Sequence, residues 1–237
     1  GYADKKNEDL VLSSSRPAAT GTETEQHVGE SFNDLFFSRR DKLGKWSEPV
    51  KLPIQVNTPA HEAAPVFNAK RTVMYFTRCE MDKKKQFGCD IWMSKKVGSN
   101  YSEPEKLVLA PERAKEDSVS ITVGHPALSA DDMTLVFASN MAGNHRNKDL
   151  YQVKLDKDGK PTGKVTSLGS AINTPKDEVF PFLRQDGTLY FSTDGRPGMG
   201  GMDIFRAAKT GESWAEPENM KFPVNSSMDD VAICFEG

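Results

Sequence analysis

The sequence predicts an all-β fold built from repeats, because two short phrases recur along the chain. Trp46-Ser47-Glu48-Pro49 reappears as Tyr101-Ser102-Glu103-Pro104 and again as Trp214-Ala215-Glu216-Pro217. The second phrase is an Asp followed by an apolar and an aromatic residue. Its aspartates lie 54 to 59 residues apart, at Asp34, Asp90, Asp149 and Asp203. A period of this length indicates units that cannot bury their own faces and must stack on one another.

Each unit has the pattern of four short strands. In the last complete unit, residues 179–183 are apolar, Asp186-Gly187 is a hairpin turn, and residues 188–192 are rich in β formers. A glycine-rich loop precedes a third strand at residues 204–207, and the Trp-x-Glu-Pro phrase leads into a fourth. Four strands at this spacing predict the blades of a β-propeller, with no helix of note.

The repeats also predict which strands pair. We expect four hairpins that join the second and third strands of each unit: residues 10–14 with 35–38, 73–77 with 91–94, 135–138 with 150–153, and 189–192 with 204–206. In the third unit residues 162–165 replace the Trp-x-Glu-Pro phrase. We therefore expect a decayed fourth strand there.

The repeats predict one β-propeller domain over residues 1–237. The units cover about residues 1–56, 57–119, 120–172 and 173–224, with a partial unit at 225–237. Residues 10–16 resemble a second strand with at most a stub before it, and residues 229–235 resemble an innermost first strand with nothing after it. The last strand could pair with residues 10–14 and close a four-bladed ring. We favour the other arrangement, a five-bladed parent, because the chain starts and stops within a unit.

Composition and motifs exclude several functions. The net charge is −3 with scattered Lys and Arg, which argues against nucleic acid as a partner. The mean hydropathy is −0.58 and no long apolar run occurs, so we expect no membrane insertion by this domain. We find no Gly-x-Ser-x-Gly, His-Glu-x-x-His or phosphate-loop motif. We therefore expect no enzymatic activity and no cofactor.

Three cysteines are present. Cys79 and Cys89 flank a polar loop between two predicted strands, where strand ends come close enough for a disulfide. The alternative is two reduced thiols, and the compartment decides between them. Cys234 stands alone, and because no CxxC or paired-His spacing accompanies these residues, we expect no metal site.

Two sets of acidic residues are candidate site residues. Pairs precede the first strands, at His61-Glu62, Asp177-Glu178 and Asp229-Asp230. Because the first strand of a blade is innermost, these pairs could rim the channel and hold a cation or a basic peptide; the alternative is a solvated opening. The second set, Asp34, Asp90, Asp149 and Asp203, recurs in every unit. That recurrence favours a structural role, in which each carboxylate braces the turn before the third strand.

Residues 181–205 resemble the PD40, or TolB-type, β-propeller repeat. The resemblance rests on Pro181, Asp186-Gly187, the Leu-Tyr-Phe-Ser run at 189–192, and Gly-Gly-Met-Asp-Ile-Phe at 200–205. The added Trp-x-Glu-Pro phrase looks like the version found in Bacteroidetes envelope proteins that also carry tetratricopeptide and OmpA-like domains. Residues 3–52 look most like the propeller of PorE-type proteins of the type IX secretion system, which is typically five-bladed.

The resemblance implies a function. It implies a periplasmic, outer-membrane-associated, non-catalytic scaffold whose partners are other cell-envelope proteins. Peptidoglycan would be bound only through a separate OmpA-like domain that is not in this chain. We expect the long loops at residues 17–32 and 81–88 to supply the contact surface. The alternative is a propeller that binds a small molecule, cation or glycan at its central channel.

Overall fold

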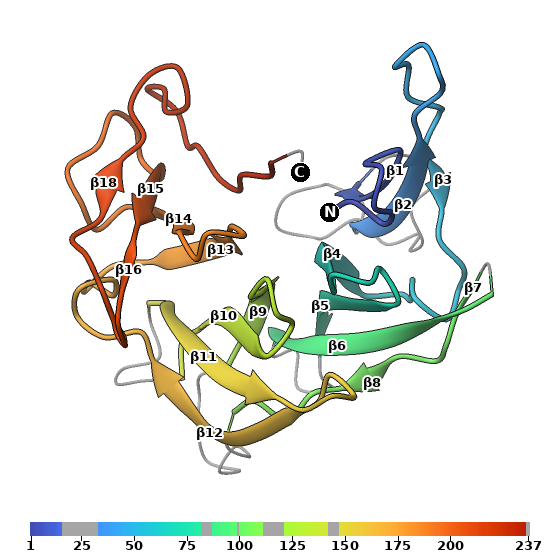
Figure 1. The fold of residues 1–237 in the computed structure, drawn as a ribbon, viewed down its shortest axis with the longest axis horizontal. Helices are drawn as coiled ribbons and strands as arrows, with labels where there is room; N and C mark the ends of the chain where they lie inside the picture. Colours follow the sequence, from blue (N-terminus) through green and yellow to red (C-terminus); the bar gives the residue numbers. More distant parts are fainter. Residues whose placement is uncertain (16–32, 82–86, 99, 111–120, 142–146, 236–237) are drawn as a thin grey trace. The chain divides into compact units, whose positions relative to one another are not determined.

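All regular structure in the described part of the chain is β (Figure 1). The computed structural model describes residues 1–15, 33–81, 87–98, 100–110, 121–141 and 147–235. They divide into two compact units, Gly1–Leu107 and Val108–Phe235. Each unit contains two antiparallel blade sheets, so the prediction of an all-β propeller fold is confirmed. Within the described ranges no helix is long and apolar enough to cross a membrane.

The first sheet contains β1 (Asp9–Ser14), β2 (Asp34–Arg39) and β3 (Val50–Lys51), in that order. Leu10 lies opposite Ser38 in the predicted hairpin. A stub of a first strand covers the inner edge of β1, as expected: Tyr2 bridges Leu10, and the Val11 N–H donates to the Gly1 carbonyl at 2.9 Å. The inner edge of β1 is therefore occupied at both residues.

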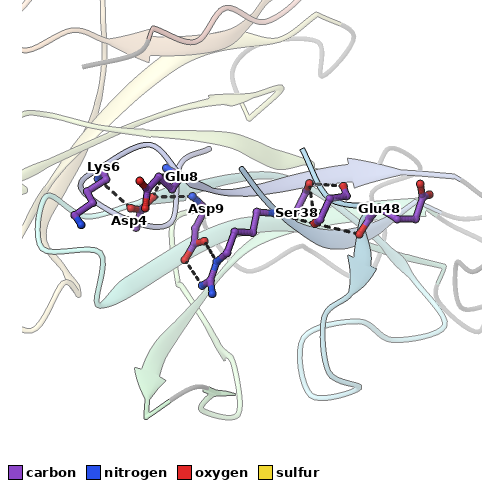
Figure 2. Close-up of polar contacts among 8 residues, drawn as sticks. Asp4, Lys6, Glu8, Asp9, Ser38 and Glu48 are labelled. Carbon is purple, nitrogen blue, oxygen red and sulfur yellow. Dashed lines mark hydrogen bonds and ion pairs between the residues drawn. The ribbon is translucent and has the colours of Figure 1, made fainter. Parts of the chain in front are cut away.

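A carboxylate holds this stub in place (Figure 2). The side chain of Asp4 accepts hydrogen bonds from the backbone N–H groups of Lys6, Glu8 and Asp9, which closes the turn before β1. The side chain of Asp9 in turn pairs with Arg39 on β2, with an Nε–Oδ1 distance of 2.6 Å. These contacts join the N-terminal turn to the first hairpin.

The second sheet contains β4 (His61–Phe67), β5 (Val73–Met81), β6 (Phe87–Val97) and β7 (Asn100–Tyr101), and β8 (Glu105–Lys106) also pairs with β6. Thr77 opposes Ile91, so the predicted hairpin is confirmed. Apolar side chains of the two sheets form the core of this unit: Ala3, Val11, Leu35, Leu52, Val56, Phe67, Met74 and Phe76.

Cys79 and Cys89 face each other across β5 and β6 and form a disulfide, with their Cα atoms 3.9 Å apart. Cys234 is a free, exposed thiol. We predict that the unreduced chain takes up one alkyl group with iodoacetamide, at Cys234, and that the reduced chain takes up three. Intact mass spectrometry measures both numbers. Three groups on the unreduced chain would mean that the pair is not oxidised.

The other unit contains the third and fourth sheets. The third runs in the order β12 (Pro161–Ser167), β11 (Asp149–Leu155), β10 (Thr134–Ser139), β9 (Val123–Leu128). The fourth contains β13 (Glu178–Leu183), β14 (Leu189–Thr193), β15 (Asp203–Ala207) and β18 (Glu218–Asn219), flanked by the pair β16 (Lys209–Thr210) and β17 (Ser213–Trp214). Both predicted hairpins of this unit are confirmed. Val136, Leu150, Phe191 and Phe205 lie in the core between the two sheets.

The prediction of a decayed fourth strand in the third unit is wrong. β12 spans seven residues, whereas β3, β8 and β18 span two each. Those three short strands each begin directly after the Pro of the repeated phrase. Proline donates no hydrogen bond and interrupts a ladder. Without that interruption, β12 pairs with β11 from Pro161 to Ser167.

The first strands share a backbone irregularity. Ala64, His125 and Phe180 have φ values of 51°, 53° and 50°, in the left-handed region. Each precedes a proline, and in each of these three strands the pairing with the second strand shifts register around this position. This β-bulge is thus a repeated feature of the blade. Ala232 has the same conformation, with φ 63°.

The prediction that residues 229–235 form a strand is wrong. Residues 229–235 follow a turn at residues 222–224 and belong to no sheet (Figure 1). A strand needs a partner that completes its ladder of hydrogen bonds, and none pairs with this segment among the described residues. The pairing expected for a closed four-bladed ring is not made at Leu10 and Val11, where Gly1–Ala3 hold the inner edge of β1.

Candidate functional site

The acidic pairs before the first strands bind the backbone of the preceding blade. In each pair, the side chain of the first residue accepts a hydrogen bond from the backbone N–H of one residue in the preceding blade. The backbone N–H of the second residue donates to the carbonyl of that residue in the preceding blade. The Asn33 N–H donates to His61 Nδ1 at 3.1 Å, and the Glu62 N–H donates to the Asn33 carbonyl at 2.8 Å. Asp177 and Glu178 hold Lys148 at 2.7 Å each. We call this arrangement the clasp.

Asp229 and Asp230 form a third clasp. The Met202 N–H donates to Asp229 Oδ1 at 2.9 Å, and the Asp230 N–H donates to the Met202 carbonyl at 2.8 Å. All three clasped residues directly precede the recurrent Asp of a third strand. The equivalent residue of the second sheet is Cys89, which the disulfide ties to Cys79. The clasp therefore links the start of one blade's third strand to the start of the next blade's first strand.

The second residue of each pair also caps the connector before it. Glu62 accepts the Thr58 hydroxyl at 2.6 Å, and Glu178 accepts the Thr174 hydroxyl at the same distance. Asp230 accepts both the N–H and the hydroxyl of Ser226, at 2.6 and 3.0 Å. The carboxylate oxygens are thus used inside the framework.

Glu62 and Glu178 therefore do not line a solvated opening, because both residues are 0% exposed. Burial raises the pKa of Glu62 to about 7 and also raises the pKa of Glu178. Asp230 is half-buried, and Asp229 is exposed. The six residues recur because each of the three clasps uses one pair.

An asparagine completes each of these three junctions; Asn57 and Asn225 are buried, and Asn173 is half-buried. The side chain of Asn57 accepts the Leu35 N–H at 2.8 Å and donates to the Leu35 carbonyl at 2.9 Å. Asn173 makes the same two bonds with Leu150, and Asn225 makes them with Ile204. The sequence analysis assigned these asparagines no role. Their recurrence in Val-Asn-Thr-Pro and related phrases is the signal that could have found it.

The recurrent Asp of the third strands takes different partners in different blades. The Asp34 carboxylate is buried and pairs with Lys51 at 3.0 Å, and Asp90 pairs with Lys106. Asp203 accepts the N–H groups of Met199 and Gly200, as expected of a residue that braces the turn. A side chain at Gly198 would fall 1.6 Å from Asp203 Oδ2, so glycine is required there. Burial raises the pKa of Asp149.

One clasp contains a buried ion pair that the sequence did not reveal. Arg78 Nε lies 2.8 Å from Glu62 Oε1, and the guanidinium also donates to the Val56 carbonyl. The central carbon of the Arg78 guanidinium, Cζ, lies 4.5 Å from the centroid of the Trp92 ring. In the fourth sheet the Thr193 hydroxyl takes the place of the guanidinium and donates to Glu178 at 2.8 Å.

Two of the left-handed residues stack on each other. The rings of His125 on β9 and Phe180 on β13 are 3.8 Å apart and nearly parallel. The Phe180 N–H donates to His125 Nδ1 at 3.4 Å. Burial, with Lys148 nearby, lowers the pKa of His125 to about 4. The imidazole is therefore neutral at pH 7, and it serves as an acceptor between two first strands.

This neutral histidine predicts sensitivity to acid. The pKa of His125 in the folded chain lies below its unfolded value of about 6.5. The stability that this neutral imidazole contributes is therefore complete above pH 6.5 and is lost as the pH falls towards 4. We expect His125→Phe, which keeps the stack, to remove up to about 3 kcal/mol of the stability difference between pH 6.5 and pH 4. Urea unfolding of both chains at the two pH values measures it. Equal acid sensitivity in both chains would contradict the prediction.

The face of the fourth sheet that points away from the third is the candidate functional surface. Tyr190, Arg206 and Glu218 lie on it, and Arg206 pairs with Glu218 at 2.8 Å. A hollow of about 240 Å³ on this face is lined by these three residues and by Arg184. Phe235 of the terminal segment covers part of the face, with its ring 4.9 Å from that of Tyr190 and 5.6 Å from that of Phe182.

Comparison with solved structures supports the propeller fold. TolB from Acinetobacter baumannii matches with a TM-score of 0.53 at 13% identity, over 94% of this chain and 44% of TolB. An α-L-arabinofuranosidase from Lactobacillus brevis matches with a TM-score of 0.52 at 14% identity, over 91% and 72% of the two chains. A protein of unknown function from Dyadobacter fermentans matches with a TM-score of 0.50 at 14% identity, over 92% and 63%.

These similarities concern the fold alone. The chain spans less than half of TolB, and one of the three proteins is a hydrolase, so the fold does not decide activity. No protein-family model and no curated protein matches the chain. The class defined here is thus a β-propeller of four-stranded blades joined by clasps.

Proposed function

We propose that this chain is a non-catalytic protein-interaction scaffold in a bacterial cell-envelope assembly of the type IX secretion kind. One observation carries the proposal: the recurrent polar residues, which would be the natural ligand-binding groups, are used between blades. What the fold offers to other molecules is its surface. Met228 and Val231, which flank the clasp residues Asp229 and Asp230, are 73% and 45% exposed. Exposed apolar side chains of this kind are typical of protein contact sites.

The location and partners follow from the repeat resemblance. We propose a periplasmic, outer-membrane-associated location, with other envelope proteins as partners. The disulfide is compatible with an oxidising compartment. The two loops expected to supply the contact surface, residues 17–32 and most of 81–88, lie outside the described residues. The surface proposed here is therefore the exposed face of the fourth sheet.

Binding of a cation, small molecule or glycan by the acidic pairs finds less support. Such a site needs carboxylate oxygens that are free to meet a ligand, and those of Glu62 and Glu178 are bound to Thr58 and Thr174. Titration of the chain with Ca²⁺ by calorimetry tests this alternative. Stoichiometric heat that Asp229→Asn abolishes would favour it over the scaffold.

Affinity capture with a matched variant tests the scaffold proposal. The tagged chain is incubated with solubilised envelope of its native host, crosslinked, and analysed by mass spectrometry. We expect a small reproducible set of envelope proteins, lost with Val231→Glu and retained with Leu43→Glu, a change at a residue that is 93% exposed on the first sheet's hairpin. Capture that is absent, or the same with both variants, would contradict the role assigned to this face.

A further inference from the structure

Each of the two sheets in the first unit brings two turns together at one end. In the first sheet these are the turn before β1 and the hairpin between β2 and β3, where the Arg40 N–H donates to the Glu8 carbonyl at 2.6 Å. In the second sheet they are the turns after β4 and after β6, where the Lys96 N–H donates to the Thr72 carbonyl at 2.8 Å. Antiparallel pairing places alternate turns of a sheet at the same end.

The turns of the two sheets are also neighbours of one another. Arg71, in the turn after β4, is close enough to the Asp4 carboxylate, in the turn before β1, to interact with its charge. Tyr101 of β7 packs on the core that the two sheets share. We call this end of the unit the turn face. It consists of residues 3–9, 39–46, 68–73 and 95–98.

The turn face is basic, although the whole chain carries a net charge of −3. It contains ten Lys and Arg residues and only four Asp and Glu residues. The ten are Lys5, Lys6, Arg39, Arg40, Lys42, Lys45, Lys70, Arg71, Lys95 and Lys96. The corresponding turns of the second unit, residues 129–134, 154–161, 184–188 and 208–213, contain five basic and six acidic residues. The positive charge is therefore a property of the first unit and not of the repeat.

Most acidic side chains of the turn face are held against its own framework. Asp4 accepts three backbone N–H groups of its turn, and Asp41 accepts the N–H groups of residues 43 and 45. Asp9 pairs with Arg39. The lysines, in contrast, extend into solvent. Six of them are exposed: Lys5, Lys6, Lys42, Lys45, Lys70 and Lys96. A ligand that approaches this face therefore meets ammonium groups first.

Two apolar side chains stand at the tips of the turn face. Leu43, on the hairpin that projects beyond β2 (Figure 1), is 93% exposed, and Val97, in the turn after β6, is 63% exposed. Lysines adjoin both of them: Lys42 and Lys45 lie around Leu43, and Lys96 precedes Val97. Such a tip suits the boundary of a bilayer, where an apolar side chain enters the acyl region and the ammonium groups meet the phosphates.

We propose that the turn face docks this chain on a bilayer that contains anionic phospholipid. The lysines would lie against the lipid phosphates, and Leu43 and Val97 would reach the upper acyl region. The chain would lie on the membrane and not cross it. This inference deepens the proposed outer-membrane-associated location, on which it rests for the choice of membrane, and gives that location a physical cause.

An acidic protein suits the turn face less well. Protein interfaces are depleted in Lys and are centred on contiguous buried anchors, often aromatic residues or Arg. Seven of the ten cations here are lysines. Two of the three arginines are engaged within the chain: Arg39 pairs with Asp9, and the Arg40 guanidinium lies 5.4 Å from the centroid of the Trp46 ring. Leu43 stands on a separate tip from Val97, so the apolar residues form no single patch.

Vesicle flotation tests the inference. The probes are vesicles of phosphatidylcholine alone and vesicles in which one third of the lipid is phosphatidylglycerol. We expect the chain to float with the mixed vesicles, to bind the neutral ones at least about tenfold more weakly, and to be released by high salt. Leu43→Ser should weaken binding to the mixed vesicles without changing its dependence on salt, because it removes an apolar contact and no charge.

A pair of double variants provides the matched control. Lys42→Glu with Lys45→Glu should weaken binding to the mixed vesicles at least about tenfold. Lys157→Glu with Lys160→Glu changes the net charge equally, on the corresponding hairpin of the third sheet, and should bind as the unmodified chain does. All four lysines are exposed, so thermal unfolding should be equal in the two double variants. Equal losses of vesicle binding in both, or equal binding to neutral and mixed vesicles, would overturn the inference.

The remaining outcomes separate this inference from the scaffold role. Val231→Glu should bind the mixed vesicles as the unmodified chain does, because it lies outside the turn face. If capture of envelope proteins fails while vesicle binding persists, the inference stands without the scaffold role. If vesicles are not bound while capture persists, the inference falls and the scaffold role stands. If capture is then lost with Lys42→Glu and Lys45→Glu, the turn face binds an acidic protein instead of a membrane.

Discussion

Replacing Arg78 by Met should destabilise the first unit by about 3 kcal/mol at pH 8, because the change leaves the Glu62 carboxylate buried without its cation. Met keeps an unbranched apolar side chain at this position but loses the guanidinium that lies over the Trp92 ring. The cost should be smaller at pH 5, where Glu62 can take up a proton. Chemical unfolding at the two pH values measures both quantities.

The sign follows from linkage. The folded pKa of Glu62, about 7, lies above its usual value of 4.5. The stability that this group contributes is therefore complete below pH 4.5 and is lost as the pH rises through 7. Removing the guanidinium raises the folded pKa further, so the loss becomes larger at high pH. A cost that falls between pH 5 and pH 8 would contradict this account.

Two controls isolate the ion pair. Adding Glu62→Gln to the Arg78→Met chain should restore most of the stability at pH 8, since replacing both partners of a buried pair is often nearly neutral. Glu178→Gln is the matched change in the fourth sheet, where Thr174 and Thr193 hydroxyls are the partners. Because hydroxyls can rotate to meet an amide, its cost should stay below about 1 kcal/mol.

The second large effect is expected at Asn57. Replacing it by Ala removes the acceptor of the buried Leu35 N–H and leaves a small cavity. The expected cost is about 2–4 kcal/mol, since an unsatisfied buried donor and lost packing both destabilise. Asn225→Ala should behave alike, because Asn225 is also 0% exposed and makes the same bonds with Ile204.

A surface asparagine provides the control for this pair. Asn100 is exposed on β7, and Asn100→Ala should change stability by less than about 0.5 kcal/mol. Thermal unfolding compares the three variants. Equal effects at Asn57 and Asn100 would show that the connector side chain does not stabilise the junction.

The hairpins were predictable because their signals are local. The turn at Gly187 marks the start of β14, and the recurrent Asp203 marks the start of β15, so both strands could be located from local residues. The repeat along the sequence is therefore sufficient to locate the strands of these hairpins.

The site was harder to predict because its contacts join residues from different blades. Glu62 and Glu178 begin strands, where side chains are usually solvated, so the sequence suggested exposed carboxylates. Their burial depends on Thr58 and Thr174. The fourth strand of the third unit was misjudged because a missing phrase was taken for a missing strand. Val165 stands where the phrase has Pro, which allows β12 to run from Pro161 to Ser167.

The proline in each Trp-x-Glu-Pro phrase protects the chain against aggregation. The fourth strand is the outermost of its blade, and a long regular outer strand can recruit other molecules side by side into fibrils. Three of these outer strands, β3, β8 and β18, follow Pro49, Pro104 and Pro217 and are only two residues long. β12 lacks this protection, but it carries Lys164 and a kink at Gly163, whose φ is 79°. Charge and irregularity on a rim discourage such stacking, so Lys164→Val should make this chain more prone to precipitate on storage.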